Sequence, residues 1–278
     1  MDSELWPEHM HQAKSHGVPL VIANARLSDR SFNRLRFFRF LHGILLPSSL
    51  RILASSEKQH DRWLSLGLDS GQVKVTGNLK VDSVSQSPPT REAKQKLKSE
   101  FGFYEKSFVL VGVSTWPGEE ETLLQSIGEL RKEKCDARLL LIPRHAERRE
   151  EIRKLISASG LPFALRSESR RADSGTVVYL ADTTGELPKL IGAGDIAFLG
   201  KTLPPNQGGQ NPIEPVAIGL PLVMGPNYQN FSQTCENLIA HNAIRLGKSE
   251  AEVKKELVGL SVSEELRGTL SKQAQQWI

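Results

Sequence analysis

The sequence has few cysteines and no long apolar segment. Its 278 residues include two cysteines, Cys135 and Cys235, whose spacing fits neither a metal-binding motif nor a disulfide framework. No run of about 18 apolar residues is present, so we expect no segment that crosses a membrane. Residues 1–10 also lack the basic start and the apolar run of a secretory signal. These absences exclude a disulfide-stapled secreted protein and favour a reducing, cytoplasmic compartment.

The sequence also lacks a strong excess of one charge. The net charge of +4 at pH 7 permits anionic partners but is too small to indicate a nucleic-acid-binding protein. No RNA- or DNA-binding module is recognisable, so we expect no nucleic-acid partner. Hydrophobic residues make up 38% and charged residues 24% of the chain, which is ordinary for a soluble protein of about two domains.

Short apolar runs alternate with amphipathic stretches, which predicts an α/β fold with parallel sheets. In a first unit, residues 1–85, we expect a helix at 57–67 that ends at Gly67, and strands at 18–27, 51–57 and 73–80. Three strands would leave an open sheet edge and uncovered faces. Two explanations stay open: residues 1–85 pack onto the rest of the chain as a remnant, or the chain is a piece of a longer protein.

A second unit, residues 86–278, is expected to be doubly wound. Pro88 and Pro89 cannot join a sheet ladder, so a linker is predicted near residues 83–90. Helices such as 118–134 and 147–160 are expected to alternate with strands at 107–115, 137–144, 176–182, 196–200 and 221–225.

Ligands of doubly wound sheets collect at the carboxyl ends of the strands, so the residues that follow each strand are candidate site residues. After the first strand of the second unit, Ser114 and Thr115 precede a helix with three glutamates in its first turn. This pattern predicts a phosphate or sugar site at the helix N-terminus, although simple helix capping is the alternative. After the third strand, Asp182 and Thr183 are expected to open a helix, and capping alone explains them.

Basic residues follow the second strand of this unit. Arg144 and His145 would point into the ligand cleft, where an arginine can bind a carboxylate or phosphate through two parallel hydrogen bonds. The alternative is a solvated, basic start of a helix.

The most specific stretch is GGQNPIEPVAIGLPLVMGP, residues 208–226. Gly208 and Gly209 allow the backbone to approach a ligand closely, and Asn211 can supply amide hydrogen bonds. Glu214 lies in the first turn of the predicted helix, where a carboxylate can accept both hydroxyls of a ribose. We therefore expect a nucleotide sugar as ligand. The alternative is a glycine-rich turn whose glutamate only balances the helix dipole.

Seven segments, in chain order from residue 2 to about residue 231, resemble the successive motifs of the 3-deoxy-D-manno-octulosonic acid (Kdo) transferases of lipopolysaccharide synthesis. They read DSELWP, NARLSDRS, TGNLKVD, STWPGEEE, PRHAER, LADTTGEL and GGQNPIEPVAIGLPLVMGPNYQNF. The resemblance implies a GT-B fold, in which two Rossmann-like domains face each other across a cleft. It implies an inverting transfer of Kdo from CMP-Kdo to a lipid A precursor at the cytoplasmic face of the inner membrane, with neither a metal nor another cofactor.

Matching motifs carry functional residues over to this chain. The resemblance implies a hinge position at Lys80 and acceptor-side residues Glu4, Trp6, Asn24, Arg26, Ser28 and Arg30. It implies that the donor is bound by Ser114, Thr115, Arg144, His145, Gly208, Gly209, Gln210, Asn211, Glu214 and Asn230.

The chain departs from the family pattern at two site positions. The family usually has histidine at the positions of Trp116 and Gln210, and an indole cannot replace the acid-base chemistry of an imidazole. The amide of Gln210 could retain a hydrogen bond. Two polar or titratable positions of the expected cleft have therefore changed.

The chain also departs from the family pattern at its ends. The family begins with a membrane anchor and a further half domain that carries its proposed catalytic base. This sequence is expected to start inside that domain, so the base would lie upstream of Met1, and whether Met1 is the true start stays open. The sequence is also expected to end before the family's last helix. No catalytic residue is therefore assigned.

The stretch from residue 26 to residue 47 interleaves arginines with phenylalanines, which suits a surface that contacts an anionic lipid interface. The alternative is a helix with an arginine-rich solvent face and phenylalanines in the core. Two further functions stay open for the whole chain. One is another GT-B enzyme that uses a UDP-sugar, and the other is a non-catalytic remnant that binds nucleotide or lipid.

Overall fold

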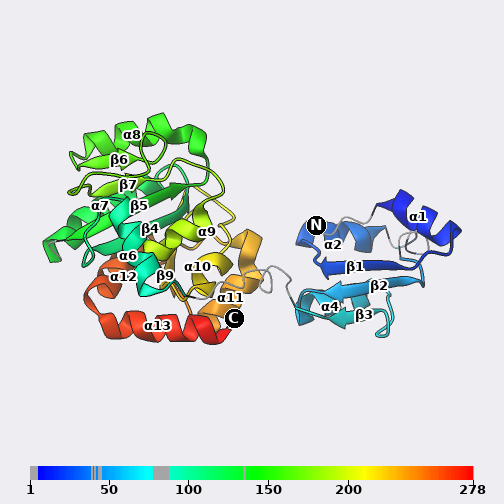
Figure 1. Ribbon diagram of the computed structural model, residues 1–278. Coiled ribbons are helices and arrows are strands. Elements are labelled where there is room, and N and C mark those ends of the chain that lie inside the picture. The colour runs from blue at the N-terminus through cyan, green and yellow to red at the C-terminus, as the bar shows by residue number, and fades with distance from the viewer. Residues whose placement is uncertain are drawn as a thin grey trace. The chain divides into compact units, whose positions relative to one another are not determined.

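The computed structural model describes residues 6–38, 40, 42, 46–77, 88–133 and 136–277. The chain forms two compact units, residues 1–83 and 84–278, and each is described by itself (Figure 1).

Some positions singled out in the sequence lie outside the described residues, namely Met1, Glu4, Lys80 and Cys135. The expectation that the family's catalytic base would lie upstream of Met1 is therefore not tested by the structure and stays a prediction. The expected domain boundary between residues 85 and 86 also lies outside the described residues and stays a prediction.

The first unit contains a three-stranded parallel sheet in the order β1-β2-β3. Its elements are α1 (Pro7–Ser15), β1 (Leu20–Ala25), α2 (Asp29–Phe37), β2 (Leu50–Ala54), α4 (Glu57–Ser65) and β3 (Val73–Val75). Leu50 and Ile52 lie two residues apart on β2, so their side chains point to the same face of the sheet. Both pack with Trp63 of α4 in one apolar core. The predicted helix and the three predicted strands are all present, although each strand is shorter than expected.

Local signals explain where α4 begins and ends. The hydroxyl of Ser56 accepts the N–H of Gln59 at 3.3 Å, which satisfies one free donor of the first turn. Gly67, at φ 98°, follows the last turn in a conformation that glycine adopts without strain. The glycine signal in the sequence therefore predicted the end of this helix correctly, whereas the cap at Ser56 was not predicted.

The second unit is built on a seven-stranded parallel sheet in the order β10-β9-β8-β4-β5-β7-β6. Its strands are β4 (Phe108–Thr115), β5 (Ala137–Pro143), β6 (Phe163–Leu165), β7 (Val178–Leu180), β8 (Ile196–Leu199), β9 (Leu222–Met224) and β10 (Arg245–Leu246). Its helices are α6 (Arg91–Glu100), α7 (Glu119–Glu133), α8 (Arg149–Ala158), α9 (Leu187–Leu190), α10 (Ile213–Ala217), α11 (Ser232–Ala240), α12 (Glu250–Val262) and α13 (Glu264–Trp277). Single 3-10 turns lie at Ala146–Arg148, Ile191–Ala193 and Gln229–Phe231.

Helices cover both faces of this sheet, and every residue of β4 is therefore buried. Val109 and Val111 belong to a core with residues of α6, α10 and α11, whereas Phe108 and Leu110 belong to a core with residues of α7, α8 and α12. Alternate residues of a strand point to opposite faces, so β4 anchors both cores. The predicted doubly wound arrangement is present.

The sequence prediction of this unit missed β6 and β10. Both strands are short and lie at the two edges of the sheet, so neither shows a long apolar run. The expected helix start at Asp182 and Thr183 is wrong, because the helix begins at Leu187. Asp182 instead accepts the backbone N–H of Ser167 at 2.9 Å and stabilises a neighbouring turn.

The strand order places a topological switch point between β4 and β8. From β4 the chain moves to β5 and on to that edge of the sheet, and it returns to β8 on the other side of β4. The connections that leave the carboxyl ends of β4 and β8 therefore diverge, and a crevice opens at this point in doubly wound folds. Residues 114–116 and 200–203, which follow these two strands, are therefore candidate site residues.

Candidate functional site

The backbone at the switch point is unusual on both strands. Ser114 at φ 52° and Lys201 at φ 60° are left-handed although neither is glycine. Such residues cost about 1–3 kcal/mol each and gather at functional sites. A Cβ atom at Gly200 would collide with the carbonyl oxygen of Ser114, so the two strand ends approach more closely than any residue with a side chain would allow.

A buried carboxylate holds the two strand ends together. Glu119, the first residue of α7, is 1% exposed and accepts the N–H of Trp116 at 2.9 Å and that of Lys201 at 2.8 Å. It also accepts the N–H groups of Thr202 at 2.8 Å and Leu203 at 3.0 Å. Burial raises the pKa of Glu119 from 4.5 to about 7, while the four N–H donors act in the opposite direction.

Three side chains lie in a row across neighbouring strand ends. Lys201 follows β8, Trp116 follows β4 and His145 follows β5. The ammonium nitrogen of Lys201 lies 4.2 Å from the centre of the Trp116 ring, and the His145 ring meets Trp116 edge-on with centroids 5.2 Å apart. The sequence analysis missed Glu119 and Lys201 as site residues. The strand-end rule could have found Lys201, since it directly follows the predicted strand 196–200.

The glycine loop lies beside Lys201. The N–H of Gly209 donates to the carbonyl oxygen of Lys201 at 3.0 Å, and the N–H of Gly208 donates to Gln229 Oε1 at 2.8 Å. The N–H of Asn230 donates back to the carbonyl oxygen of Gly208 at 2.8 Å. The loop is thus held between the ends of β8 and β9, and the structure brings together Gly208, Gly209 and Asn230, three of the residues expected to bind the donor.

Both glycines of this loop have positive φ, 102° and 72°. A Cβ at Gly208 would lie 2.5 Å from Asn230 Nδ2, and one at Gly209 would lie 2.9 Å from the Cα of Tyr228. Glycine is therefore required here by the packing of the loop itself. Gln210, which is partly exposed, follows this tight turn. The side chain of Asn211 accepts the N–H of Ile213 at 3.2 Å.

Glu214 lies in the first turn of the short helix α10, as the sequence predicted. Its Oε2 atom is buried and has no hydrogen-bond partner within the described part of the chain. Burial raises the pKa of Glu214, and the nearby positive charge of Arg144 lowers it. A half-buried carboxylate with a free oxygen can accept a hydroxyl group of a bound molecule.

Other predicted donor residues end the neighbouring strands. The N–H of Arg144 donates to the carbonyl oxygen of Thr115 at 3.1 Å, which joins the ends of β5 and β4. Among the described residues, two more buried side-chain atoms lack a partner at this edge, Thr115 Oγ1 and Trp116 Nε1. With Glu214 Oε2 they offer a bound molecule both donors and acceptors. Buried polar atoms without partners are typical of a ligand-binding site.

The glutamates after Glu119 have a structural role. Glu120 is 1% exposed and forms an ion pair with Arg148 at 2.8 Å, which joins α7 to the start of α8. Glu121 is exposed. The acidic first turn of α7 therefore combines capping and packing. Within the described residues, no group of three histidine, cysteine, aspartate or glutamate side chains could hold a metal ion.

The predicted acceptor-side residues follow the sheet of the first unit. Asn24, at φ 54°, is the last but one residue of β1, and its buried Oδ1 lacks a partner in the described ranges. Ser28 caps α2 by accepting the N–H of Ser31 at 3.1 Å, which favours a structural role. Arg26 is partly exposed, while Arg30 and Trp6 are exposed.

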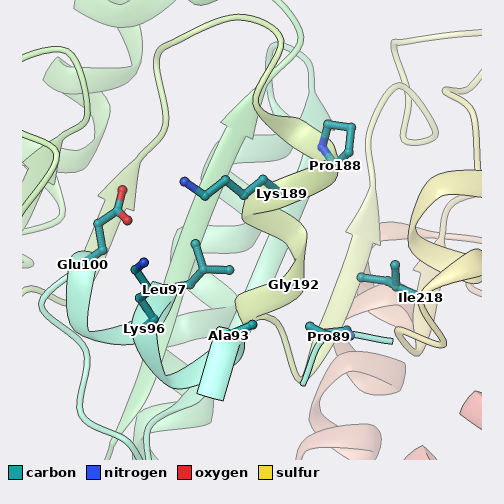
Figure 2. A pocket seen from close by; sticks show the side chains of 9 residues that line it. All are labelled: Pro89, Ala93, Lys96, Leu97, Glu100, Pro188, Lys189, Gly192 and Ile218. Carbon is teal, nitrogen blue, oxygen red and sulfur yellow. The ribbon is translucent and has the colours of Figure 1, made fainter. Parts of the chain in front are cut away.

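A separate pocket of about 440 Å³ lies between α6, α9 and the end of α10 (Figure 2). Its walls are formed by Pro89, Ala93, Lys96, Leu97, Glu100, Pro188, Lys189, Gly192 and Ile218. None of these residues is a predicted site residue. Among the described residues of the second unit, the buried polar atoms that lack partners, Thr115 Oγ1, Trp116 Nε1 and Glu214 Oε2, all lie outside this pocket.

Both units are similar in sequence to known proteins. Residues 1–83 match a family model described as "3-Deoxy-D-manno-octulosonic-acid transferase (kdotransferase)". A 3-deoxy-D-manno-octulosonic acid transferase of Haemophilus influenzae is 33% identical over 241 residues, which cover 86% of this chain and 55% of that protein. The chain spans about half the length of the curated relatives it matches.

Two solved structures extend the comparison. The C-terminal CMP-Kdo binding domain of WaaA from Acinetobacter baumannii is 26% identical with a TM-score of 0.62, over 67% of this chain and 96% of that one. Anabaena Alr3699/HepE in complex with UDP is 18% identical with a TM-score of 0.59, over 97% of this chain and 70% of that one, and its likeness concerns the fold alone. The predicted relationship to the Kdo transferases and the predicted α/β fold class of the GT-B type are confirmed.

Proposed function

We propose, from the chain's place in the Kdo transferase family, that residues 84–278 bind the donor CMP-Kdo and that the chain serves inverting transfer of Kdo to a lipid A precursor. The observation that carries this proposal is the free, buried Oε2 atom of Glu214, which lies in the first turn of α10 and close enough to Arg144 for the arginine's charge to lower its pKa. A relative whose structure has a TM-score of 0.62 to this chain is described as a CMP-Kdo binding domain.

The chemistry of the site suits a nucleotide. The Glu214 carboxylate can accept the hydroxyls of the ribose, while the backbone at Gly208 and Gly209 allows the sugar or phosphate to approach closely. Arg144, which lies near enough to lower the pKa of Glu214, supplies positive charge for the phosphate that departs with CMP. We propose that this charge serves in place of a metal ion, so that transfer needs no cofactor.

Calorimetric titration of the purified chain with CMP and with UDP tests the proposal. We expect saturable binding of CMP and at least about tenfold weaker binding of UDP, which corresponds to about 1.4 kcal/mol. A preference for UDP would place the chain with UDP-sugar enzymes. Binding of neither nucleotide would favour a remnant without a donor site.

We propose that the first unit contacts the acceptor and an anionic membrane surface. Phe37 and Phe40 are each 77% exposed, and Phe38 lies between them in the sequence with its ring 5.1 Å from Phe37 and 6.0 Å from Phe40. Arg34 and Arg36 are exposed on the adjoining helix α2. Exposed aromatic rings beside arginines are typical of surfaces that bind anionic lipid.

Helix α2 combines the two alternatives expected for residues 26–47, a surface for anionic lipid and a helix that packs on a core. Phe32 and Leu35 pack on the core of the first unit, and the guanidinium of Arg62 lies 5.4 Å from the Phe32 ring. The phenylalanines at its end are exposed. No helix in the described ranges is long and apolar enough to span a membrane. We propose a peripheral position at the cytoplasmic face of the inner membrane, with Asn24 and Arg26 toward the acceptor.

A further inference from the structure

We propose that Lys201 binds an anionic group of the donor and that Trp116 positions its ammonium for this contact. The inference rests on the proposed function and deepens it, because it names the residue that recognises negative charge. The donor offers two anionic groups of similar chemistry, the phosphate of the nucleotide and the carboxylate of the sugar acid. Both are bound by an ammonium through charge-assisted hydrogen bonds.

The main chain of Lys201 is fixed at the switch point of the sheet. Its N–H donates to the buried carboxylate of Glu119 at 2.8 Å, and its carbonyl oxygen accepts the N–H of Gly209 at 3.0 Å. Its φ of 60° is rare for a residue with a side chain. The surrounding contacts therefore hold a strained lysine between α7 and the glycine loop, where a ligand of the proposed class would bind.

The side chain of Lys201 differs from the other basic side chains at these strand ends. His145 pairs with Glu147 at 3.1 Å, and Arg144 lies near Glu214. The ammonium of Lys201 instead lies 4.2 Å from the centre of the Trp116 ring, and it forms no salt bridge within the described part of the chain. A cation held on an aromatic face keeps its charge available to an arriving anion, because no carboxylate neutralises it.

Trp116 is well placed to position this ammonium. The backbone N–H of Trp116 donates to the carboxylate of Glu119, which also accepts the backbone N–H of Lys201. One buried group therefore fixes the main chains of both residues. The Trp116 ring is held edge-on by His145. The Nε1 atom of Trp116 is buried and lacks a partner among the described residues, which indicates that the indole also faces a polar group of the ligand. Trp116 is therefore a positioning residue for Lys201.

The test compares Lys201→Gln and Lys201→Arg with the wild type in titrations with cytidine, CMP and CMP-Kdo. If Lys201 meets the phosphate, we expect Lys201→Gln to weaken CMP binding about tenfold and to leave cytidine binding unchanged. If it meets the sugar carboxylate, CMP binding is unchanged and CMP-Kdo binding weakens about tenfold. Lys201→Arg, which keeps the charge, retains most of the affinity. Lys96→Gln, an equal charge change at the pocket of Figure 2, is the matched control.

Two further readouts separate charge recognition from a structural effect. The affinity of Lys201→Gln for the anionic ligand depends less on salt concentration than that of the wild type. Trp116→Leu weakens the same ligand several-fold in the wild type and clearly less in the Lys201→Gln background, because a part of its effect acts through the Lys201 contact. Additive effects would contradict the positioning role.

The outcomes that overturn the inference are distinct from those that overturn the proposed function. If the wild type binds CMP or CMP-Kdo and Lys201→Gln binds both within about twofold of it, the role of Lys201 is wrong while the donor site stands. If the wild type binds no ligand of the series, both are wrong. A loss that is equal for cytidine, CMP and CMP-Kdo shows that Lys201 shapes the site without recognising charge.

Discussion

The carboxylate of Glu119 accepts the backbone N–H of Lys201 at 2.8 Å across the switch point of the sheet. Glu119 begins α7, whereas Lys201 follows β8, so this one bond joins segments far apart in the sequence. Three more backbone N–H groups share the same carboxylate. The geometry of the candidate donor site therefore depends on a buried acid that contacts no ligand in the proposed mechanism.

This buried acid predicts an unusual pH dependence of stability. Because the pKa of Glu119 is raised from 4.5 to about 7 in the folded protein, the folded state binds more protons than the unfolded state between these values. The Glu119 contribution to the free energy of unfolding therefore falls as pH rises through this window, by about 3 kcal/mol. Urea unfolding between about pH 5 and pH 8 should show this fall in the wild type relative to Glu119→Gln. If the free energy of unfolding changes with pH in the same way in both proteins, the raised pKa of Glu119 is contradicted.

Gly200→Ala is expected to destabilise the second unit by about 2–3 kcal/mol, because the new Cβ would collide with the carbonyl oxygen of Ser114. The control is Gly259→Ala in α12, where a Cβ meets nothing within 4 Å and helix propensity predicts a gain of about 0.5–1 kcal/mol. Both values come from thermal unfolding. Equal stability of the two variants would mean that the strand ends separate at little cost.

Glu214→Ala is expected to weaken CMP binding about tenfold or more, because the variant loses the only acceptor that we assign to the ribose hydroxyls. Glu121→Ala, which removes an exposed carboxylate from α7, should leave the affinity unchanged. Calorimetry measures both. Unchanged affinity in the Glu214 variant would remove the assignment of this residue.

Arg166→Leu is expected to destabilise the second unit by about 3–5 kcal/mol at neutral pH. The buried guanidinium binds Glu186 through two hydrogen bonds of 2.7 Å and Glu100 through one of 2.8 Å. Arg166 also lowers the pKa of Glu186 from 4.5 to about 2. The Glu186 part of this stability is therefore present above pH 4.5 and is lost as pH falls toward 2. Chemical unfolding at about pH 7 and about pH 3 should show the two proteins closer in stability at the lower pH.

Charge reversal at Arg34 and Arg36 is expected to reduce binding to anionic lipid vesicles at least about tenfold, since each basic residue near such a surface contributes about 1 kcal/mol. Vesicle co-sedimentation at low and at physiological salt measures it. Reversal at the exposed Arg170 and Arg171 of the second unit is the matched control. If both double variants lose binding equally, the attraction reflects net charge alone, and the surface around Phe37 has no special role.

Periodicity and capping signals in the sequence predicted much of the fold. Apolar runs such as 107–115 and 137–144 became the central strands β4 and β5, because a strand buried on both faces must be apolar throughout. The edge strands β6 and β10 were not predicted, because strands of three and two residues are too short to show a recognisable run or alternation of apolar residues. Asp182 was assigned to a helix start, whereas its partner Ser167 becomes a neighbour only in the folded chain.

The sequence by itself determined the family resemblance and most residues of the candidate site, because the glycine loop and the motifs after the strands are contiguous stretches of chain. Only the tertiary structure decided which of these residues meet. The order of the strands places β8 beside β4, and this neighbourhood brings Lys201 onto Trp116 and the carboxylate of Glu119 to the backbone of both. No local pattern encodes that contact, because it depends on how a sheet of seven strands is wound.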